Sequence, residues 1–209
     1  MVMPGPAPDP HLLSWMAFVD GENLTIRGQE VAKDRGLQLT QGRYFERDVF
    51  FWRMHNTHAN SGRLRFVNPA YPRLQWAGIR SYYYTSVHGD SQKLQSIEES
   101  LWHMGFTPKV FKKEKKEAKA KAVDIALTTD MLSHAFGNHY SAAVLVTGDG
   151  DFLPVVEQVK RAGKTVIVAA FSNGMNRDLQ ITADVFFDLT DFFIDWWEAT
   201  TKRDPNSLK

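Results

Sequence analysis

Short runs of consecutive apolar residues recur along this chain, and between them apolar residues return every three or four positions. The unbroken runs predict buried strands at residues 16–20, 79–84, 107–111, 142–149, 164–171 and 184–189. The spaced pattern predicts helices at residues 90–104, 122–136 and 152–162, with Gly105 and Gly163 at two C-terminal caps. Unbroken apolarity is typical of parallel strands covered on both faces. We therefore expect an α/β fold, with three α/β/α layers around a central, mainly parallel, Rossmann-like sheet.

One domain accounts for most of the chain. The predicted boundaries are a flexible lead-in with four prolines at residues 1–11, the domain at 12–200 and a tail at 201–209. Residues 29–76 indicate an insertion that packs on the core. Within it, residues 42–55 are compatible with an amphipathic helix, and the residues that follow are rich in turn formers.

The composition narrows the chemistry that the chain can perform. It has 209 residues, of which 43% are hydrophobic, enough for one sizeable core. The absence of cysteine excludes disulfides, thiolate nucleophiles and zinc sites with cysteine ligands. The formal net charge of +1 does not indicate any class of binding partner. Only local clusters of charge can indicate one. The start lacks the basic region of a signal peptide and no apolar run approaches the ~20 residues of a membrane helix, so we expect a cytoplasmic protein without membrane association.

Four aspartates fall where predicted strands end or predicted helices begin. Asp20 ends the first strand, Asp149 ends a later one, Asp151 opens the next helix, and Asp124 lies in the first turn of another. Ligands of open parallel sheets bind outside the carboxyl ends of the strands. If the strands that end at Asp20 and Asp149 are neighbours, these carboxylates converge at that edge of the sheet, which we call the rim.

Each aspartate alone has a simpler structural role. Asp20 is compatible with a strand-end cap, Asp149 and Asp151 with a turn that caps a helix, and Asp124 with a favourable charge at a helix N-terminus. Together they favour a site for Mg²⁺ or Mn²⁺, because hard cations prefer oxygen ligands and can assist an in-line phosphoryl displacement. Asp130 lies about 600° around the helix from Asp124 and points elsewhere. The reserve candidates are Asp184 and Glu22, and for Glu22 a side chain that faces solvent is the favoured alternative.

Four segments carry a recognisable pattern in the same order: FVDGENL, KAVDIALTTDML, VLVTGDGDFLPVVEQVKRAGKTVIVAAF and ADVFFDL. They closely resemble the NYN domain of the LabA-like family, within the PIN-like nuclease fold. The resemblance runs from about residue 17 to residue 189 and covers residues 29–76 poorly. Its most specific elements are Asp-Gly-x-Asn and Gly-Asp-x-Asp-Phe at strand ends.

This resemblance implies a Mg²⁺- or Mn²⁺-dependent ribonuclease of the PIN type. The catalytic and metal-binding acids of the family fall on Asp20, Asp124, Asp149 and Asp151. The catalytic asparagine of the family falls on Asn23, whose amide would hold a ligand water or the scissile phosphate. Thr147 would form a hydrogen bond to one of these acids without contacting the metal itself. Not all members of the family are demonstrated nucleases, but the four intact acids favour activity.

A basic segment precedes Asp124. Residues 109–121 hold seven lysines and two glutamates. A solvated surface is the ordinary interpretation of such a run. Its position beside the predicted rim instead favours contact with the phosphates of a nucleic acid. The candidate nucleic-acid-binding residues are Lys112, Lys113, Lys119, Lys121 and Arg27, the last of which is also compatible with an ordinary surface arginine.

Several aromatic and histidine side chains support weaker hypotheses. Tyr82 or Tyr84 would stack an unpaired base if exposed near the rim, and packing in the core is the alternative. The other pairs are His55 with His58 and His134 with His139, which are weak zinc candidates, and Trp196 with Trp197, which fit a docked C-terminal helix or a homodimer contact.

The sequence thus predicts a metal-dependent endoribonuclease that acts on single-stranded or loop RNA and uses Mg²⁺ or Mn²⁺. A catalytically silent RNA-binding or regulatory protein with the same fold is the first alternative. A phosphatase or Toprim-like enzyme using the same acids is less favoured, because DGEN lacks the Asp-x-Asp-x-Thr pattern of an aspartyl-phosphate nucleophile.

Overall fold

The structure is a computed structural model that describes residues 14–37, 45–46, 49–52, 78–113 and 121–190. The strands are β1 (Trp15–Asp20), β2 (Phe45–Glu46), β3 (Val49–Trp52), β4 (Gly78–His88), β5 (Thr107–Lys113), β6 (Ala142–Val146), β7 (Thr165–Ala170) and β8 (Val185–Asp188). The helices are α1 (Gly21–Asp34), α3 (Ser91–His103), α4 (Lys121–Phe136), α5 (Leu153–Arg161) and α6 (Arg177–Thr182), with a short 3₁₀ helix, η3 (Gly150–Phe152), before α5.

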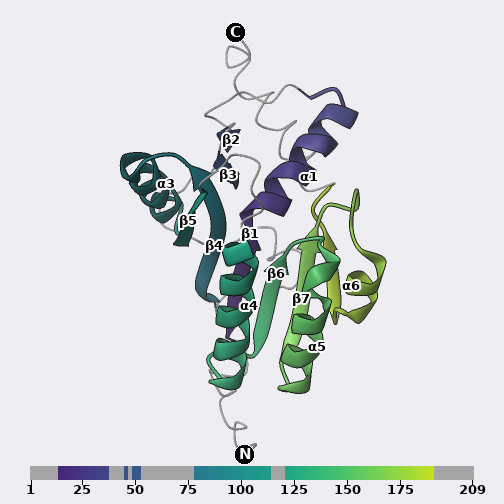
Figure 1. Cartoon of the computed structure of the whole chain (residues 1–209). Coiled ribbons are helices and arrows are strands. Elements are labelled where there is room, and N and C mark those ends of the chain that lie inside the picture. Colours follow the sequence, from purple (N-terminus) through teal and green to yellow (C-terminus); the bar gives the residue numbers. More distant parts are fainter. Residues whose placement is uncertain (1–13, 38–44, 47–48, 53–77, 114–120, 191–209) are drawn as a thin grey trace, which may run out of the picture.

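The described strands form one sheet (Figure 1). Six of them are parallel and follow the order β5-β4-β1-β6-β7-β8. β2 and β3 form an antiparallel ribbon that attaches to β4 at Val87. β1 pairs with β4 on one side and with β6 on the other. The predicted parallel sheet is confirmed, and the strands that carry Asp20 and Asp149 at their ends are neighbours.

Helices cover both faces of this sheet. α1 and α3 pack on one face around residues such as Leu24 and Leu101, and α4, α5 and α6 pack on the other around residues such as Leu127. Along β1, Ala17 and Val19 belong to the first core and Met16 and Phe18 to the second. This alternation is why the strand has to be apolar at every position. It also directs Asp20, two residues after Phe18, to the face covered by α4.

Short polar signals set the ends of the helices. α1 follows β1 without a loop, because Asp20 is both the last strand residue and the N-cap of the helix. Asp90 caps α3 in the same way by accepting a hydrogen bond from the Lys93 N–H. Gly105 and Gly163 adopt φ values of 86° and 75° after α3 and α5, as predicted for C-terminal caps.

The sequence pattern did not predict α1. The residues it buries return at helical spacing, but three of them are Gly21, Thr25 and Gly28, which carry no apolar signal. The amphipathic helix that residues 42–55 were compatible with does not form in the described part of that stretch, because Phe45–Glu46 and Val49–Trp52 are strands. Aromatic and β-branched side chains in that stretch favour a strand once β4 offers an edge to pair with.

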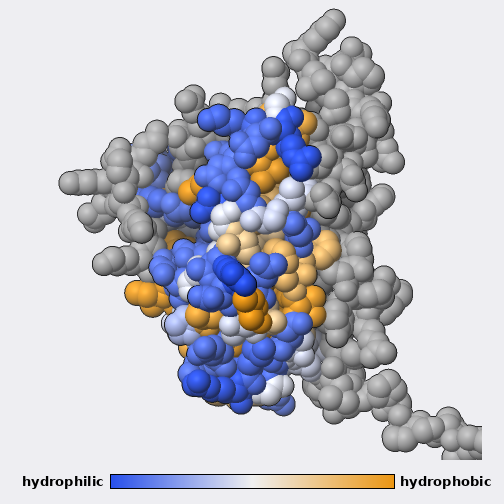
Figure 2. Space-filling model, turned by 90° about the vertical axis from the view of Figure 1, so that its right-hand side faces the viewer, coloured by the Kyte–Doolittle hydropathy of each residue, from blue (hydrophilic) through white to orange (hydrophobic). Residues whose placement is uncertain are grey.

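Several sequence predictions lie outside the described residues. They concern the lead-in at 1–11, the tail at 201–209, most of the stretch 29–76, His55, His58, Trp196 and Trp197. None of the helices in the described ranges has both the length and the apolarity needed to cross a membrane. The side of the molecule with α5 and α6 mixes hydrophilic and hydrophobic residues, so apolarity alone does not single out a binding surface on it (Figure 2).

Candidate functional site

Asp20 occupies the carboxyl end of the central strand and is buried, with 5% of its surface exposed. Its Oδ1 accepts a hydrogen bond from the backbone N–H of Asn23 at 3.0 Å, within the first turn of α1. Its Oδ2 accepts one from the hydroxyl of Thr147 at 2.9 Å, just beyond the end of β6. A backbone N–H of α1 and a side chain just beyond β6 therefore hold one carboxylate in a fixed orientation at the rim.

Two more hydrogen bonds tie the loop after β6 to α1. The Gly148 N–H donates to the side-chain Oδ1 of Asn23 at 2.9 Å, and the Asp149 N–H donates to the Thr147 hydroxyl at 3.2 Å. The hydroxyl of Thr147 thus donates a hydrogen bond to Asp20 and accepts one from the N–H of Asp149. The side chain of Asn23 positions the loop through its oxygen. Its amide nitrogen is the group that would hold a ligand water or the scissile phosphate, as the resemblance implies.

The electrostatics of the rim set Asp20 apart. The pKa of its carboxyl is raised from 3.8 to about 7. Burial is the largest cause, the charges of Asp124 and Glu22 add to it, and the hydrogen bonds from Asn23 and Thr147 act in the opposite direction. These two carboxylates therefore act on Asp20 across a short distance. A buried carboxylate with further negative charge around it binds a cation favourably and is typical of functional sites.

Asp149 and Asp151 follow β6 and are exposed. The Asp149 Oδ1 accepts a hydrogen bond from the Asp151 N–H at 3.0 Å and caps η3. This is the bond expected of a capping turn, so capping is one role of Asp149. The Thr147 hydroxyl connects the backbone N–H of Asp149 with the carboxylate of Asp20.

A residue that sequence reasoning missed supports this loop from the side. Asn176 caps α6 by accepting from the Leu179 N–H at 3.0 Å, and its own N–H donates to the Gly148 carbonyl at 3.0 Å. A Cβ atom on Gly150 would lie 2.4 Å from the Asn176 side-chain nitrogen. Gly150 is therefore required for close contact between two loops. The signal was an asparagine at a helix start, which is common and not specific.

The donor set can be compared with the needs of a divalent cation. In the described part of the chain, no three acidic or histidine side chains converge into a preformed metal site. The donors nevertheless fit a hard cation in kind, because Asp20 offers buried carboxylate oxygens and Asp124 and Glu22 add negative charge beside it. Mg²⁺ commonly takes only one or two protein carboxylates and completes its shell with waters and phosphate oxygens.

The predicted basic residues fall into different environments. Lys112 is exposed near the end of β5, whereas Lys113 is buried with its Nζ 3.4 Å from Glu22 Oε1. Together with His88 and Gly89 they line a hollow of about 390 Å³. Lys119 and the side chain of Lys121 lie outside the described residues.

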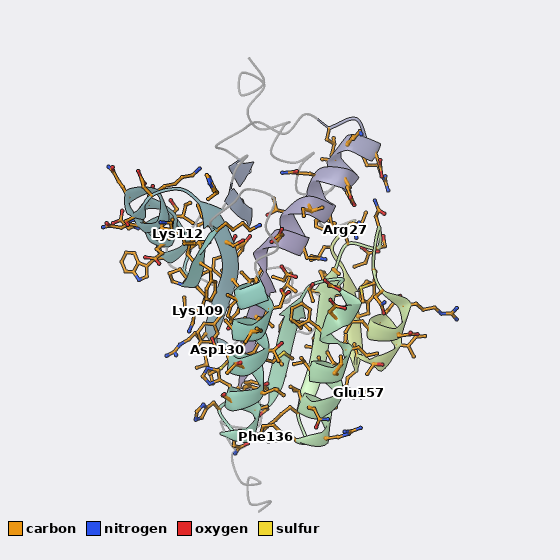
Figure 3. The ribbon with its side chains drawn as sticks, viewed as in Figure 1. Arg27, Lys109, Lys112, Asp130, Phe136 and Glu157 are labelled. Carbon is orange, nitrogen blue, oxygen red and sulfur yellow. The ribbon has the colours of Figure 1, made fainter. Side chains whose placement is uncertain are left out.

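Arg27 and Asp130 each have a charged partner. Arg27 forms an ion pair with Glu30 at 2.8 Å, and its guanidinium lies against Gly174. Asp130 accepts a hydrogen bond from the Tyr84 hydroxyl at 2.9 Å and pairs with Lys109 at 3.1 Å. Figure 3 shows Lys109 on β5 and Asp130 on α4, both below Lys112. Asp130 is thus part of a polar group on the side of the molecule.

The two tyrosines are core residues. Tyr82 and Tyr84 are 5% and 0% exposed, so the hypothesis that either stacks an exposed base is wrong. Alternation along β4 directs both rings under α4, where Tyr82 packs against Phe18. The Tyr82 hydroxyl contacts His134 Nε2 at 2.9 Å, and His134 Nδ1 contacts His139 Nδ1 at 2.9 Å. These histidines extend the same polar group.

Comparisons with known proteins give one family and two relatives. The NYN domain family matches residues 15–190. The chain is 27% identical over 199 residues to the low amplitude and bright protein LabA of Synechococcus elongatus, a match that covers 90% of this chain and 89% of that protein. It is 30% identical over 112 residues to an uncharacterized protein of Methanocaldococcus jannaschii, a match that covers 53% of this chain and 43% of that protein.

A solved structure has the same fold. The crystal structure of a protein of unknown function from Vibrio parahaemolyticus superposes with a TM-score of 0.59 at 17% identity, over 88% of this chain and 96% of that one. At this identity the likeness concerns the fold alone. It agrees with the parallel sheet and flanking helices of the PIN-like arrangement.

Proposed function

The chain belongs to the NYN domain family, a PIN-like and nuclease-like family, and from this premise we propose that it is a metal-dependent endoribonuclease. Its substrate would be single-stranded or loop RNA, and the reaction hydrolysis of a phosphodiester bond. The observation that carries the proposal is Asp20, a buried carboxyl at the carboxyl end of the central strand whose pKa is raised to about 7. A cation beside such a carboxyl would stabilise its ionised form.

The residues of the rim would have different roles in this reaction. The hydroxyl of Thr147 and the Asn23 N–H keep both oxygens of Asp20 in place, so the carboxylate presents its remaining lone pairs in a fixed direction. Asp124, Asp149 and Asp151 add carboxylates from the start of α4 and from the loop after β6. A bound Mg²⁺ or Mn²⁺ would supply an activated water and offset the charge that develops on the phosphate.

The positively charged residues would bring the substrate to this rim. RNA must approach a cluster of negative charge, so phosphate contacts from lysine side chains are needed to offset the repulsion. The exposed Lys112 and the buried Lys113 stand at the end of β5, in the hollow beside the rim. This placement supports phosphate binding on the side of β4 and β5.

The alternative is an RNA-binding protein of the same fold that does not cut. The observation in its favour is that Asp149 serves as a cap for η3, a role that requires no metal. The two functions differ in one respect that can be measured. Both predict RNA binding, and only the first predicts cleavage that depends on Mn²⁺ and on Asp20.

The test is cleavage of a labelled RNA with an unpaired loop, in Mn²⁺ and in EDTA. We expect cleavage by the wild type in Mn²⁺ alone, and its loss in Asp20→Asn with RNA binding retained. Asp90→Asn is the matched control, since Asp90 is also an N-cap but lies on the exposed side of α3. Cleavage at the same rate by Asp20→Asn and the wild type would contradict the proposal. Binding without any cleavage by the wild type would establish the alternative.

A further inference from the structure

A hollow lies beside the rim at the carboxyl ends of β4 and β5. It measures about 390 Å³ and is lined by His88, Gly89, Lys112 and Lys113, with His88 and Lys113 at paired positions of the two strands. β4 is also the neighbour of β1, whose last residue is Asp20. The described residues that line the hollow thus include basic side chains and no acidic ones, and they adjoin the carboxylates. This basic lining fits an anionic group such as a phosphate.

Lys113 differs from an ordinary surface lysine. Only 7% of its surface is exposed, and lysines are rarely this buried unless they are paired. Its Nζ lies 3.4 Å from Glu22 Oε1. Charged hydrogen bonds are usually about 2.7–2.9 Å long, so this pair is held by charge and not by an optimal hydrogen bond. Lys112 is exposed, which makes it a natural comparison.

The partner of Lys113 belongs to the rim. Glu22 stands in the first turn of α1, and its charge acts on Asp20 together with that of Asp124. Lys113 therefore offsets part of the negative charge of these carboxylates. A divalent cation beside Asp20 would meet the positive charge of Lys113, and like charges repel. A phosphate in the hollow would attract the same ammonium group, and the flexible four-carbon stem of lysine allows it to change partner.

We propose that Lys113 exchanges partners between Glu22 in the free protein and a backbone phosphate of RNA in the hollow. In the free protein it weakens the binding of a divalent cation. When it moves to the phosphate, Glu22 is released to the rim and cation binding strengthens. By linkage, the cation must raise the affinity for RNA by the same factor. The inference rests on the proposed function for its two ligands, but it concerns binding and requires no cleavage.

The test measures Mn²⁺ affinity by calorimetry, without RNA and with a single strand of about ten nucleotides. Without RNA, we expect Lys113→Met to bind Mn²⁺ about fivefold more tightly than the wild type, because a nearby positive charge is lost. RNA should then raise the Mn²⁺ affinity of the wild type more than that of Lys113→Met. Lys112→Met is the control and should weaken RNA binding without changing Mn²⁺ affinity. Lys113→Gln replaces Lys113→Met if the latter does not fold.

Glu22→Gln gives the complementary measurement. It should bind RNA more tightly than the wild type in EDTA, because Lys113 no longer has the negative charge of Glu22 beside it, and it should bind Mn²⁺ more weakly. Equal Mn²⁺ affinity in the wild type and Lys113→Met would overturn the inference, as would an equal gain in Lys112→Met. A wild type that binds Mn²⁺ and RNA in this coupled way without cutting would support the inference and contradict the nuclease function.

Discussion

Replacing Asp20 by asparagine should stabilise the metal-free protein, and increasingly so as the pH rises. The carboxyl of Asp20 has a pKa of about 7 in the folded chain, against an ordinary value of 3.8. For an acid, a raised folded-state pKa penalises the ionised form. The penalty is therefore absent below about pH 4, builds as the pH rises toward 7, and is complete above it. Asparagine keeps the shape of the side chain and removes the charge.

The magnitude follows from this difference in pKa. Each unit corresponds to about 1.4 kcal/mol, so the ionised carboxylate costs the folded state about 4 kcal/mol at most above pH 7. At about pH 5, where the unfolded chain is already ionised, the cost is about 1.7 kcal/mol. The gap in unfolding free energy between Asp20→Asn and the wild type should thus widen by roughly 2–3 kcal/mol from about pH 5 to about pH 8. Hydrogen bonds changed by the substitution contribute equally at both pH values and cancel.

The assay is thermal unfolding in EDTA, followed by circular dichroism at both pH values. For a chain of this length, the widening corresponds to roughly 5–10 °C in melting temperature. Other titrating groups are shared by both proteins, so the comparison isolates Asp20. The gap between Asp90→Asn and the wild type should stay constant, because Asp90 caps α3 in an exposed position. A constant gap for Asp20→Asn as well would refute the claim that this carboxyl is desolvated.

Three further predictions concern the same region. Mn²⁺ at about a hundredfold excess over its Kd should stabilise the wild type by about 2.7 kcal/mol and Asp20→Asn much less; equal shifts in melting temperature would remove Asp20 from the ligands. Lys112→Ala should reduce the slope of log RNA affinity against log salt by about 0.7, and an unchanged slope would leave Lys112 outside the RNA contact. Gly150→Ala should lower stability by about 1–3 kcal/mol, since its Cβ would lie 2.4 Å from Asn176, whereas Gly148→Ala, with its nearest neighbour at 3.4 Å, should cost less; equal losses would contradict the close contact.

The parallel strands were predictable because burial on both faces leaves an unbroken apolar run. β1, β6 and β7 are apolar at nearly every position. A short run of consecutive apolar residues is typical of a strand that is covered on both faces. α1 was not predictable in the same way, since glycine and threonine fill half of its buried positions. The ribbon of β2 and β3 depends on pairing with a strand more than thirty residues later in the chain, a contact that local patterns do not contain.

The candidate site likewise has features that the sequence could predict and features that it could not. The sequence was enough to predict that Asp20 and Asp149 come at the carboxyl ends of parallel strands, which the structure places side by side. The sequence could not tell that Asp20 is buried and Asp149 exposed, or that Lys113 is buried against Glu22 while its neighbour Lys112 is exposed. Those differences arise from packing between distant segments. Asn176 was missed for this reason too, since its contact with Gly150 joins two loops that are separate in the sequence.

The central claim is that the carboxylates at the rim hold a divalent cation. The most direct measurement is anomalous diffraction from a crystal of the protein soaked in Mn²⁺. We expect an anomalous peak about 2.0–2.2 Å from a carboxylate oxygen of Asp20, with Asp124 or Asp149 bound directly or through water. Well-ordered rim carboxylates without a peak at saturating Mn²⁺, or a peak only at unrelated surface acids, would contradict it.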